Sequence, residues 1–306
     1  MNENELNEYI KKAEEGDVNS QVLLGLTYLN GTDEIPANDK EAFKWFKAAA
    51  EQGNPIAQCN LGICYSNGEG VKQDFKEAFR WFKAAAEQGY ANAKYNLGIC
   101  YLNGEGVKHD YNEALRWYKA AAEQGHAKAQ YNLGICYSNG NGVKQDYKEA
   151  FRWYKTAAEQ GLAEAQKMLG NCYYFGKGVK QDYNEAFRWF KAAAEQGDEK
   201  AQNKLGVFYY NGKGGRQDYN EAFRWFKAAA EQGDEKAQFN LGICYSNGEG
   251  VRQDYKEAYY WYLISYRNGC IYAEHYVKSI ENKLTDQQKQ EVQNRVNEWF
   301  RTHAEE

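Results

Sequence analysis

Seven cysteines and four histidines are the residues best equipped for chemistry, because thiolates and imidazoles act as nucleophiles and metal ligands. Five of the cysteines share one position of a 36-residue spacing, namely Cys64, Cys100, Cys136, Cys172 and Cys244. Phe208 fills that position once, as expected of an apolar packing site. A helix between successive equivalents separates them by about 8–10 Å or more, whereas a disulfide needs Cα atoms within roughly 7 Å. We therefore expect reduced, structural thiols, with Cys59 and Cys270 as unpaired extras.

Motifs for catalysis or cofactor binding are incomplete. The histidines are scattered and show no metal-ligand spacing, so we expect no metal and no cofactor. The segment from Gly170 to Gly178 resembles a P-loop, but its spacing is one residue too long and no Ser or Thr follows Lys177. Ser-x-x-Lys, Gly-x-Ser-x-Gly and His-Glu-x-x-His are absent from the sequence. The sequence therefore predicts a protein without catalytic residues.

The composition is that of a packed protein of 306 residues, with 43% hydrophobic and 16% aromatic content. The net charge of −5 disfavours a nucleic-acid partner. The first ten residues are acidic and lack the apolar core of a Sec signal peptide, and no segment has the roughly 18 apolar residues of a membrane span. We expect a cytoplasmic protein without membrane insertion, and export by a non-Sec route stays open.

The chain is dominated by an internal repeat of 36 residues. Seven of the eight tryptophans fall at this spacing: Trp45, Trp81, Trp117, Trp153, Trp189, Trp225 and Trp261. Units begin at Gly53 and every 36 residues thereafter, and a longer first unit begins at Gly16. Self-similarity at this period is typical of solenoids, whose units each bury their apolar face against a neighbour.

The sequence of each unit predicts a pair of helices. Ala57, Leu61 and Tyr65 recur at helical spacing and predict a first helix, helix A, over about residues 55–66. Two glycines end it, and Asp74 with Glu77 gives the capping-box pattern that begins helix B. In helix B the apolar stripe is Ala78, Trp81 and Ala85, widened by Phe75, Phe79 and Phe82. We expect Gly62 to permit close helix approach opposite Trp81 and Tyr65.

The sequence at both ends of the repeat array predicts capping segments. Residues 1–15 align with the second half of a repeat, with Leu6 and Tyr9 at core positions. Residues 269–306 predict a half-repeat whose helix A carries Tyr272, Ala273 and Val277, followed by a last helix that begins at Thr285. The apolar stripe of the last helix is Val292, Val296, Trp299 and Phe300, and we expect it to cover Tyr260 and Leu263 of the seventh repeat.

The residues that recur in the units resemble the pattern of the Sel-one-like repeat (SLR) family, a branch of the tetratricopeptide-like α-solenoids. The resemblance rests on Leu61-Gly62, Tyr65, Gly68-x-Gly70-Val71, Asp74, Ala78, Trp81, Ala84-Ala85 and Gly89, in that order and in nearly all seven copies. It implies an all-α, right-handed solenoid whose helix A lines the concave side, and a role as an adaptor that binds other proteins. A cysteine-rich branch of the family carries Cys pairs at sites that look like Ala85 and Ala93 here, so its disulfide ladder and β-lactam-related roles do not carry over.

The domain organisation follows from the repeats. We expect one repeat domain over residues 1–306, with a capping half-repeat at 1–15, seven repeats at 16–268, and the half-repeat and capping helix at 269–306.

The candidate binding surface is the stripe of helix A opposite its core positions. An Asn ladder on it could hold the backbone of an extended segment, while Ile neighbours and the pair Lys167 and Lys204 select side chains or an acidic group. Alternatively, the Asn side chains only cap or solvate the helix surface. The candidate residues are Cys59, Asn60, Ile63, Asn67, Tyr95, Asn96, Ile99, Tyr131, Asn132, Ile135, Lys167, Met168, Asn171, Phe175, Lys204 and Asn240. A uniform Arg and Lys ladder on helix B, offset by Glu77 and Glu87, predicts only a solvated face.

Together these features predict a monomeric, non-enzymatic scaffold that binds a partner peptide or domain in the helix A groove. Two alternatives stay open at this point. One is a small-molecule or β-lactam-binding, enzyme-like relative, and the other is a consensus-like repeat protein without a dedicated partner.

Overall fold

The computed structural model describes residues 3–303, and every regular element in that range is an α-helix. Helix A of the seven repeats and the half-repeat corresponds to α2 Val18–Asn30, α4 Pro55–Asn67, α6 Ala91–Asn103, α8 Ala127–Asn139, α10 Ala163–Phe175, α12 Glu199–Asn211, α14 Glu235–Asn247 and α16 Ala273–Glu281. Helix B corresponds to α3 Asp39–Glu51, α5 Phe75–Glu87, α7 Tyr111–Ala122, α9 Tyr147–Glu159, α11 Tyr183–Glu195, α13 Tyr219–Glu231 and α15 Tyr255–Arg267. The terminal helices are α1 Glu3–Glu14 and α17 Asp286–Thr302. The predicted all-α repeat solenoid is confirmed.

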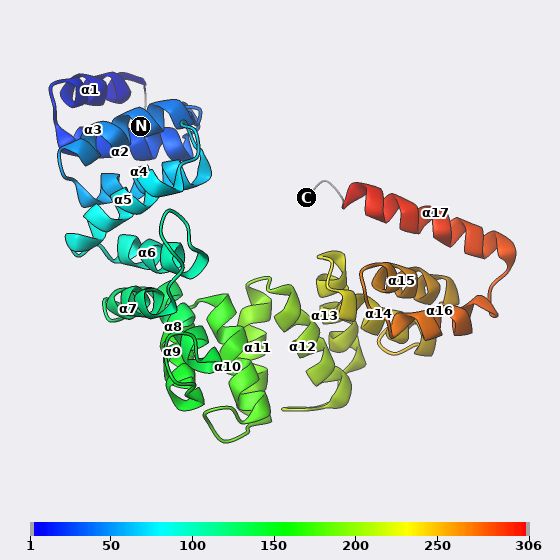
Figure 1. The fold of residues 1–306 in the computed structure, drawn as a ribbon. Coiled ribbons are helices and arrows are strands. Elements are labelled where there is room, and N and C mark those ends of the chain that lie inside the picture. Colours follow the sequence, from blue (N-terminus) through cyan, green and yellow to red (C-terminus); the bar gives the residue numbers. More distant parts are fainter. Residues whose placement is uncertain (1–2, 304–306) are drawn as a thin grey trace. The chain divides into compact units, whose positions relative to one another are not determined.

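The chain forms two compact units, one ending at Thr156 and the other beginning at Ala157. Within the first unit, each helix from α1 to α7 packs against the next helix in chain order. Within the second, each helix from α10 to α15 does the same, and α17 packs back on α15 (Figure 1). Each unit therefore has the nearest-neighbour stacking of a solenoid. A single domain over the whole chain stays a prediction.

The helix ends follow the predicted signals. The Asp74 carboxylate accepts hydrogen bonds from the backbone N–H of Lys76 (2.9 Å) and Glu77 (3.1 Å), as an N-cap does. The Glu77 carboxylate lies 2.8 Å from Arg80, so in α5 it makes an ion pair on the helix surface. The reciprocal capping box is present at α17, between Thr285 and Gln288. Gly68 ends α4 in the left-handed conformation, with φ of 79°.

The second glycine of each loop packs against the preceding repeat. Gly70 has φ of 69°, and a Cβ atom there would lie on the carbonyl of Asp39, the first residue of α3. Gly106, Gly142, Gly214 and Gly250 meet the preceding helix B in the same way. The loop glycines therefore serve close contact between repeats, and this explains them without a phosphate ligand.

The close approach inside each hairpin differs from the expected one. A Cβ atom on Gly62 would lie 2.6 Å from the ring of Phe82, so Phe82, not Trp81, packs opposite this glycine. Phe82 is buried, whereas Trp81 is half-buried, with the Arg80 guanidinium 4.8 Å from its ring centroid. The Phe82 side chain thus points into the hairpin. The Trp81 side chain points toward the edge of helix B, where its ring both packs against neighbouring residues and makes a cation–π contact with Arg80.

A buried glutamine joins successive repeats. Gln58 of α4 donates to the carbonyl of Ala50 at the end of α3 (3.3 Å), and its own amide oxygen accepts from Gln88 at the end of α5 (2.8 Å). The same arrangement recurs at Gln202 and Gln238. Each glutamine therefore adds a side-chain hydrogen bond to a buried helix C-terminal carbonyl, which also accepts from a backbone N–H of its own turn, and links that carbonyl to the end of the next helix B.

Both predicted caps are present. In α1, Leu6 and Tyr9 pack against a cluster that contains Trp45. In α17, Val292 and Val296 are completely buried in the core cluster that holds Tyr260 and Leu263. The docking of the last helix on the seventh repeat is confirmed.

Candidate interaction surface

The exposed side of helix B carries its own counter-charges. The arginines at position 80 and its equivalents pair with the glutamate three residues earlier, and the Arg side chains are between 64% and 74% exposed. The pairs are Arg80–Glu77, Arg116–Glu113, Arg152–Glu149, Arg188–Glu185 and Arg224–Glu221. This face is a regular array of solvated ion pairs, which contribute little stability individually and leave little net charge for a partner.

In the first unit, the helix A stripe is only partly open. Cys59 was expected on the surface, and that prediction is wrong: its exposed fraction is 2%, because the thiol faces α6 and accepts a hydrogen bond from Asn96 (3.6 Å). The Asn60 amide donates to the Ile56 carbonyl of its own helix (2.9 Å). At least part of the Asn ladder therefore serves the solenoid itself, although an amide with one bond keeps further donor and acceptor capacity.

The other candidates of the first unit lie on this side of α4, α6 and α8. Asn67 is exposed; the half-buried candidates are Ile63, Tyr95, Asn96, Ile99, Tyr131, Asn132 and Ile135. The Tyr95 ring stacks on His126, with centroids 4.7 Å apart. These candidates combine apolar and aromatic side chains with amides.

In the second unit, Lys167 does not offer its charge to a ligand, so the prediction that it selects an acidic group is wrong. Its ammonium lies 2.5 Å from the Asp198 carboxylate, and the two side chains are 19% and 9% exposed. Asp198 is the N-cap of α12, so the pair links α10 to the next repeat. The other lysine of the predicted pair, Lys204, is half-buried, and its ammonium lies 5.7 Å from the Tyr174 ring centroid.

The remaining candidates of this unit are open to differing degrees. Asn171 donates to the Met168 sulfur at 4.0 Å, within α10, and both side chains are half-buried. Phe175 is 57% exposed at the end of α10. Asn240 donates to the Asn203 carbonyl oxygen across α12 and α14 (2.9 Å).

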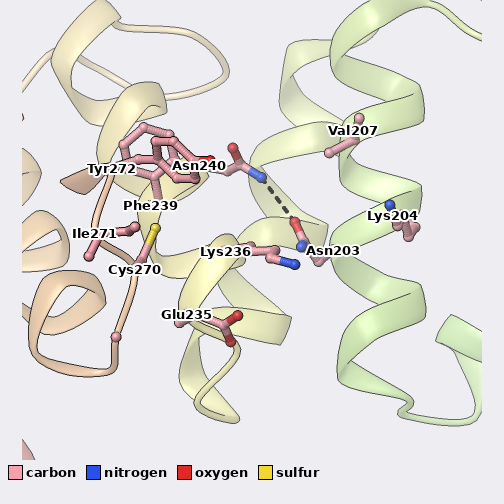
Figure 2. A pocket seen from close by; sticks show the side chains of 11 residues that line it. Asn203, Lys204, Val207, Glu235, Lys236, Phe239, Asn240, Cys270, Ile271 and Tyr272 are labelled. Atoms are coloured by element: carbon pink, nitrogen blue, oxygen red, sulfur yellow. Dashed lines mark hydrogen bonds between the residues drawn. The ribbon is translucent and has the colours of Figure 1, made fainter.

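A pocket of about 350 Å³ lies on the helix A side of α12 and α14 and is closed by the turn before α16 (Figure 2). One wall is apolar, formed by Phe239, Ile271 and Tyr272. The opposite side carries Lys204 and Val207 of α12, and Lys236, Asn203 and Asn240 lie between the two sides. An apolar cavity with a few convergent polar groups is the usual form of a binding site.

Sequence reasoning missed most of this pocket. Tyr272 was expected in the core of the half-repeat, but it precedes α16 and is 75% exposed, as is Ile271 at 73%. The available signal was that Ile271 and Tyr272 are large and apolar at the two positions that earlier repeats fill with Glu235-Lys236 or Ala163-Glu164 at the start of helix A.

The thiols are unsuited to nucleophilic chemistry. All seven cysteines are free and buried, and burial raises the pKa of Cys64 and Cys244 to about 12. A thiol with such a pKa carries almost no thiolate at neutral pH. Residues 3–303 contain no group of three potential metal ligands, and no helix in that range has the length and apolar character of a membrane span.

Comparison with protein families decides what the repeats are. The Sel1 repeat model matches residues 18–54, 55–90, 91–126, 127–162, 163–198, 199–234 and 235–270. The chain belongs to the Sel1 repeat family. Sel1 repeats mediate protein–protein interaction, and their proteins are typically scaffolds of a generally non-enzymatic fold. The resemblance inferred from the sequence is thus confirmed.

Solved structures of other Sel1 repeat proteins are similar over nearly the whole chain. A Sel1 repeat protein from Oxalobacter formigenes is 34% identical, with a TM-score of 0.71, covering 90% of this chain and 79% of that one. A protective antigen of uropathogenic Escherichia coli strains with an SLR fold is 28% identical, with a TM-score of 0.54, covering 96% and 86%.

A curated relative matches over a shorter stretch. An F-box protein of Arabidopsis thaliana is 40% identical over 70 residues, which is 23% of this chain. The match spans 19% of that relative's length, so the likeness concerns the repeats.

Proposed function

We propose that this Sel1 repeat protein is a non-enzymatic scaffold that holds a partner protein through the helix A side of its repeats. The single observation that carries this is the contrast between the two sides of the hairpins. Helix B presents ion pairs in which both the arginine and the glutamate belong to the same helix. Helix A presents exposed apolar groups, amides and the pocket beside Lys204 and Ile271. A surface that is apolar at its centre and polar at its rim is the usual form of a protein interface.

The proposal also follows from what the repeats lack. The thiols are buried, burial raises the pKa of Cys64 and Cys244 to about 12, and the cap carboxylates such as Asp74 are engaged by backbone N–H groups. These thiols and cap carboxylates thus serve the fold, which supports a binding role for the repeats.

The test is capture of partners by the immobilised full chain from a lysate of its native host, with cross-linking. Two helix A variants are used, Asn60→Ala with Asn96→Ala and Asn132→Ala in the first unit, and Lys204→Glu with Ile271→Asp in the second. The matched control replaces exposed helix B lysines, Lys119→Ala with Lys227→Ala. We expect at least one helix A variant to lose the cross-linked partner at an unchanged melting temperature, while the control keeps it. Loss in the control alone, or full capture by all three, would contradict the proposal.

A further inference from the structure

Repeats five and six reverse a charge that most other repeats keep negative. The residue between the two loop glycines is glutamate in repeats two, three and seven, at Glu69, Glu105 and Glu249. In repeats five and six it is Lys177 and Lys213. The last turn of helix A changes with it, because Tyr174 and Phe175 stand where the second repeat has Ser66 and Asn67.

These substitutions form one cluster, which we call the lysine–aromatic cluster: Tyr174, Phe175, Lys177, Lys204 and Lys213. The Lys213 ammonium lies 5.4 Å from the Tyr174 ring centroid and donates to its hydroxyl oxygen at 3.4 Å. Lys204 of α12 lies 5.7 Å from the same ring, and Lys177 lies 5.9 Å from the ring of Phe175. Aromatic rings thus hold three ammonium groups of two repeats on one patch.

Two of these lysines have no carboxylate to neutralise them. Within the described range 3–303, no acidic oxygen lies within 4.0 Å of the Lys204 or Lys213 ammonium, whereas Lys167 on the same side is paired with Asp198. A cation–π contact positions an ammonium but leaves its positive charge in place. The cluster is therefore a site of uncompensated positive charge in a chain whose net charge is −5.

The cluster continues into the pocket of the second unit. Lys204 belongs to both, since it lines the pocket opposite Phe239, Ile271 and Tyr272. Figure 2 shows the Asn203–Asn240 hydrogen bond between the lysine side and the apolar wall. This bond uses one N–H of Asn240 and leaves its carbonyl oxygen and second N–H able to pair with a peptide backbone.

The remaining charge of the pocket does not cancel the lysines. Glu235 also lines it, but in the first turn of α14, next to Lys236, where the helix N-terminus favours a carboxylate. The side of the pocket that adjoins the cluster is formed by Lys204 and Val207.

We propose that the lysine–aromatic cluster and the pocket together bind an acidic peptide segment of the partner protein, with one apolar side chain of that segment seated against Phe239, Ile271 and Tyr272. The carboxylates of the segment pair with Lys204 and Lys213, and Asn240 pairs with its backbone. A volume of about 350 Å³ is at the small end for a ligand pocket, as an anchor side chain requires. The proposal rests on the proposed function and names the chemistry of its partner.

The experiment selects peptides from a random phage-displayed library on the full-length chain. Enriched sequences are then synthesised with a fluorescent label, and their affinity is measured by fluorescence anisotropy. We expect the enriched peptides to share an apolar residue flanked by Asp or Glu, and to bind more weakly as salt rises, since charge pairs at an interface are screened. Replacing their acidic residues by Asn and Gln should weaken binding about tenfold.

Variants of the chain then locate the site. Lys204→Met with Lys213→Met, and separately Ile271→Ser with Tyr272→Ser, should each weaken binding about tenfold or more. Lys119→Met with Lys227→Met, which removes the same number of charges from helix B, should leave affinity unchanged. Thermal melts of every variant confirm that the fold is intact; Ile271 and Tyr272 are exposed, so their loss removes little core.

Three outcomes would overturn the proposal. Enriched peptides could lack acidic residues, or they could bind the Lys204→Met/Lys213→Met protein as tightly as the parent. Sedimentation could show a concentration-dependent dimer that Ile271→Ser with Tyr272→Ser abolishes, which would assign the surface to a second copy of this chain. If any of these occurs while Asn60→Ala, Asn96→Ala and Asn132→Ala still abolish capture of the host partner, the scaffold function stands and only the acidic-peptide assignment falls.

Discussion

Gln238 shows how much one polar side chain contributes at a junction between repeats. It is completely buried, donates to the carbonyl of Ala230 at the end of α13 (3.2 Å), and accepts from Asn268 after α15 (2.9 Å). We predict that Gln238→Met, which keeps the volume, lowers the free energy of unfolding by about 1–3 kcal/mol, because the Ala230 carbonyl loses one of its donors and the Asn268 amide loses its acceptor at a buried junction. Urea denaturation of the full chain measures this loss.

The matched control is Gln290→Met. Gln290 lies exposed on α17 and makes its amide contact there with Asn294. It should change stability by no more than about 0.5 kcal/mol. Equal effects of the two substitutions would show that the buried glutamine does not hold the repeats together.

His126 gives the first unit a pH-dependent helix cap. Its Nδ1 accepts from the backbone N–H of Ala129 at 3.1 Å, a contact that needs the neutral imidazole. Burial lowers the pKa of His126 below its usual value of 6.5, and the nearby Lys128 lowers it further. The folded state therefore binds the proton less tightly than the unfolded state, so stability is full above about pH 6.5 and is lost as pH falls below it.

We predict that acidification from about pH 7.5 to 5.5 destabilises the parent chain more than it destabilises His126→Asp, because only the parent has to protonate a half-buried imidazole that acts as a cap. Aspartate serves as the cap at the equivalent positions Asp198 and Asp234, and its carboxylate accepts the N–H hydrogen bond without the neutral imidazole that His126 requires. Thermal melts of both proteins across the pH series give the difference. Parallel pH profiles would mean that the imidazole does not act as the cap.

At the scale of the helix, the glycine in the middle of helix A fixes the distance to helix B. A Cβ atom at Gly206 would lie 2.6 Å from the Phe226 ring. Alanine is favoured over glycine in a helix by about 1 kcal/mol, but overpacking a core costs typically 1–3 kcal/mol. We predict that the clash wins and that Gly206→Ala lowers the free energy of unfolding by about 1–2 kcal/mol.

Phe226→Leu tests the mechanism of that loss. In its background, Gly206→Ala should cost less than in the parent chain, because the shorter side chain leaves room for the methyl group. A stabilising Gly206→Ala substitution in the parent would show that the two helices can move apart at little cost. The higher helix propensity of alanine would then outweigh the clash with Phe226.

The helices themselves could be read from the sequence because every signal was repeated seven times. The spacing of Leu61 and Tyr65, the cap at Asp74 and the glycine stops are local features, and they place α4 and α5 within a residue of the structure. What periodicity does not give is the exact direction of a side chain within a broad apolar stripe. Phe82 and Trp81 are adjacent on helix B, and only the observed close approach to Gly62 shows which one enters the hairpin.

The candidate site was harder to predict because it depends on contacts between repeats. Cys59 lies on the predicted stripe, yet the neighbouring α6 covers it. Lys167 looks like a free cation in sequence, but it meets Asp198, 31 residues away, across the repeat boundary. Ile271 and Tyr272 belong to a turn whose path the repeat pattern does not specify, because the pattern ends there.

At the scale of the whole molecule, stability depends on covering the last stacking face. The seventh helix B replaces the exposed Arg and Lys of earlier repeats with Tyr260 and Leu263, and α17 buries both. At the edge of the contact between α15 and α17, the Arg295 guanidinium lies 2.6 Å from the Glu257 carboxylate and 4.2 Å from the Tyr260 ring centroid. A nearest-neighbour array without such a cap would present its core to water.

We predict that Val292→Asp with Val296→Asp releases α17, lowers the free energy of unfolding of the chain by about 3 kcal/mol or more, and makes the protein associate through the uncovered α15 face. Both valines are completely buried, and an unpaired carboxylate there has to be desolvated or expelled together with its helix. Differential scanning calorimetry and sedimentation measure the two effects.

Gln290→Asp with Asn294→Asp adds the same charge to the exposed side of the same helix and should leave both readouts unchanged. A monodisperse valine variant with the parent's melting temperature would show that the seventh repeat is stable uncapped, and Tyr260 and Leu263 would then need another explanation.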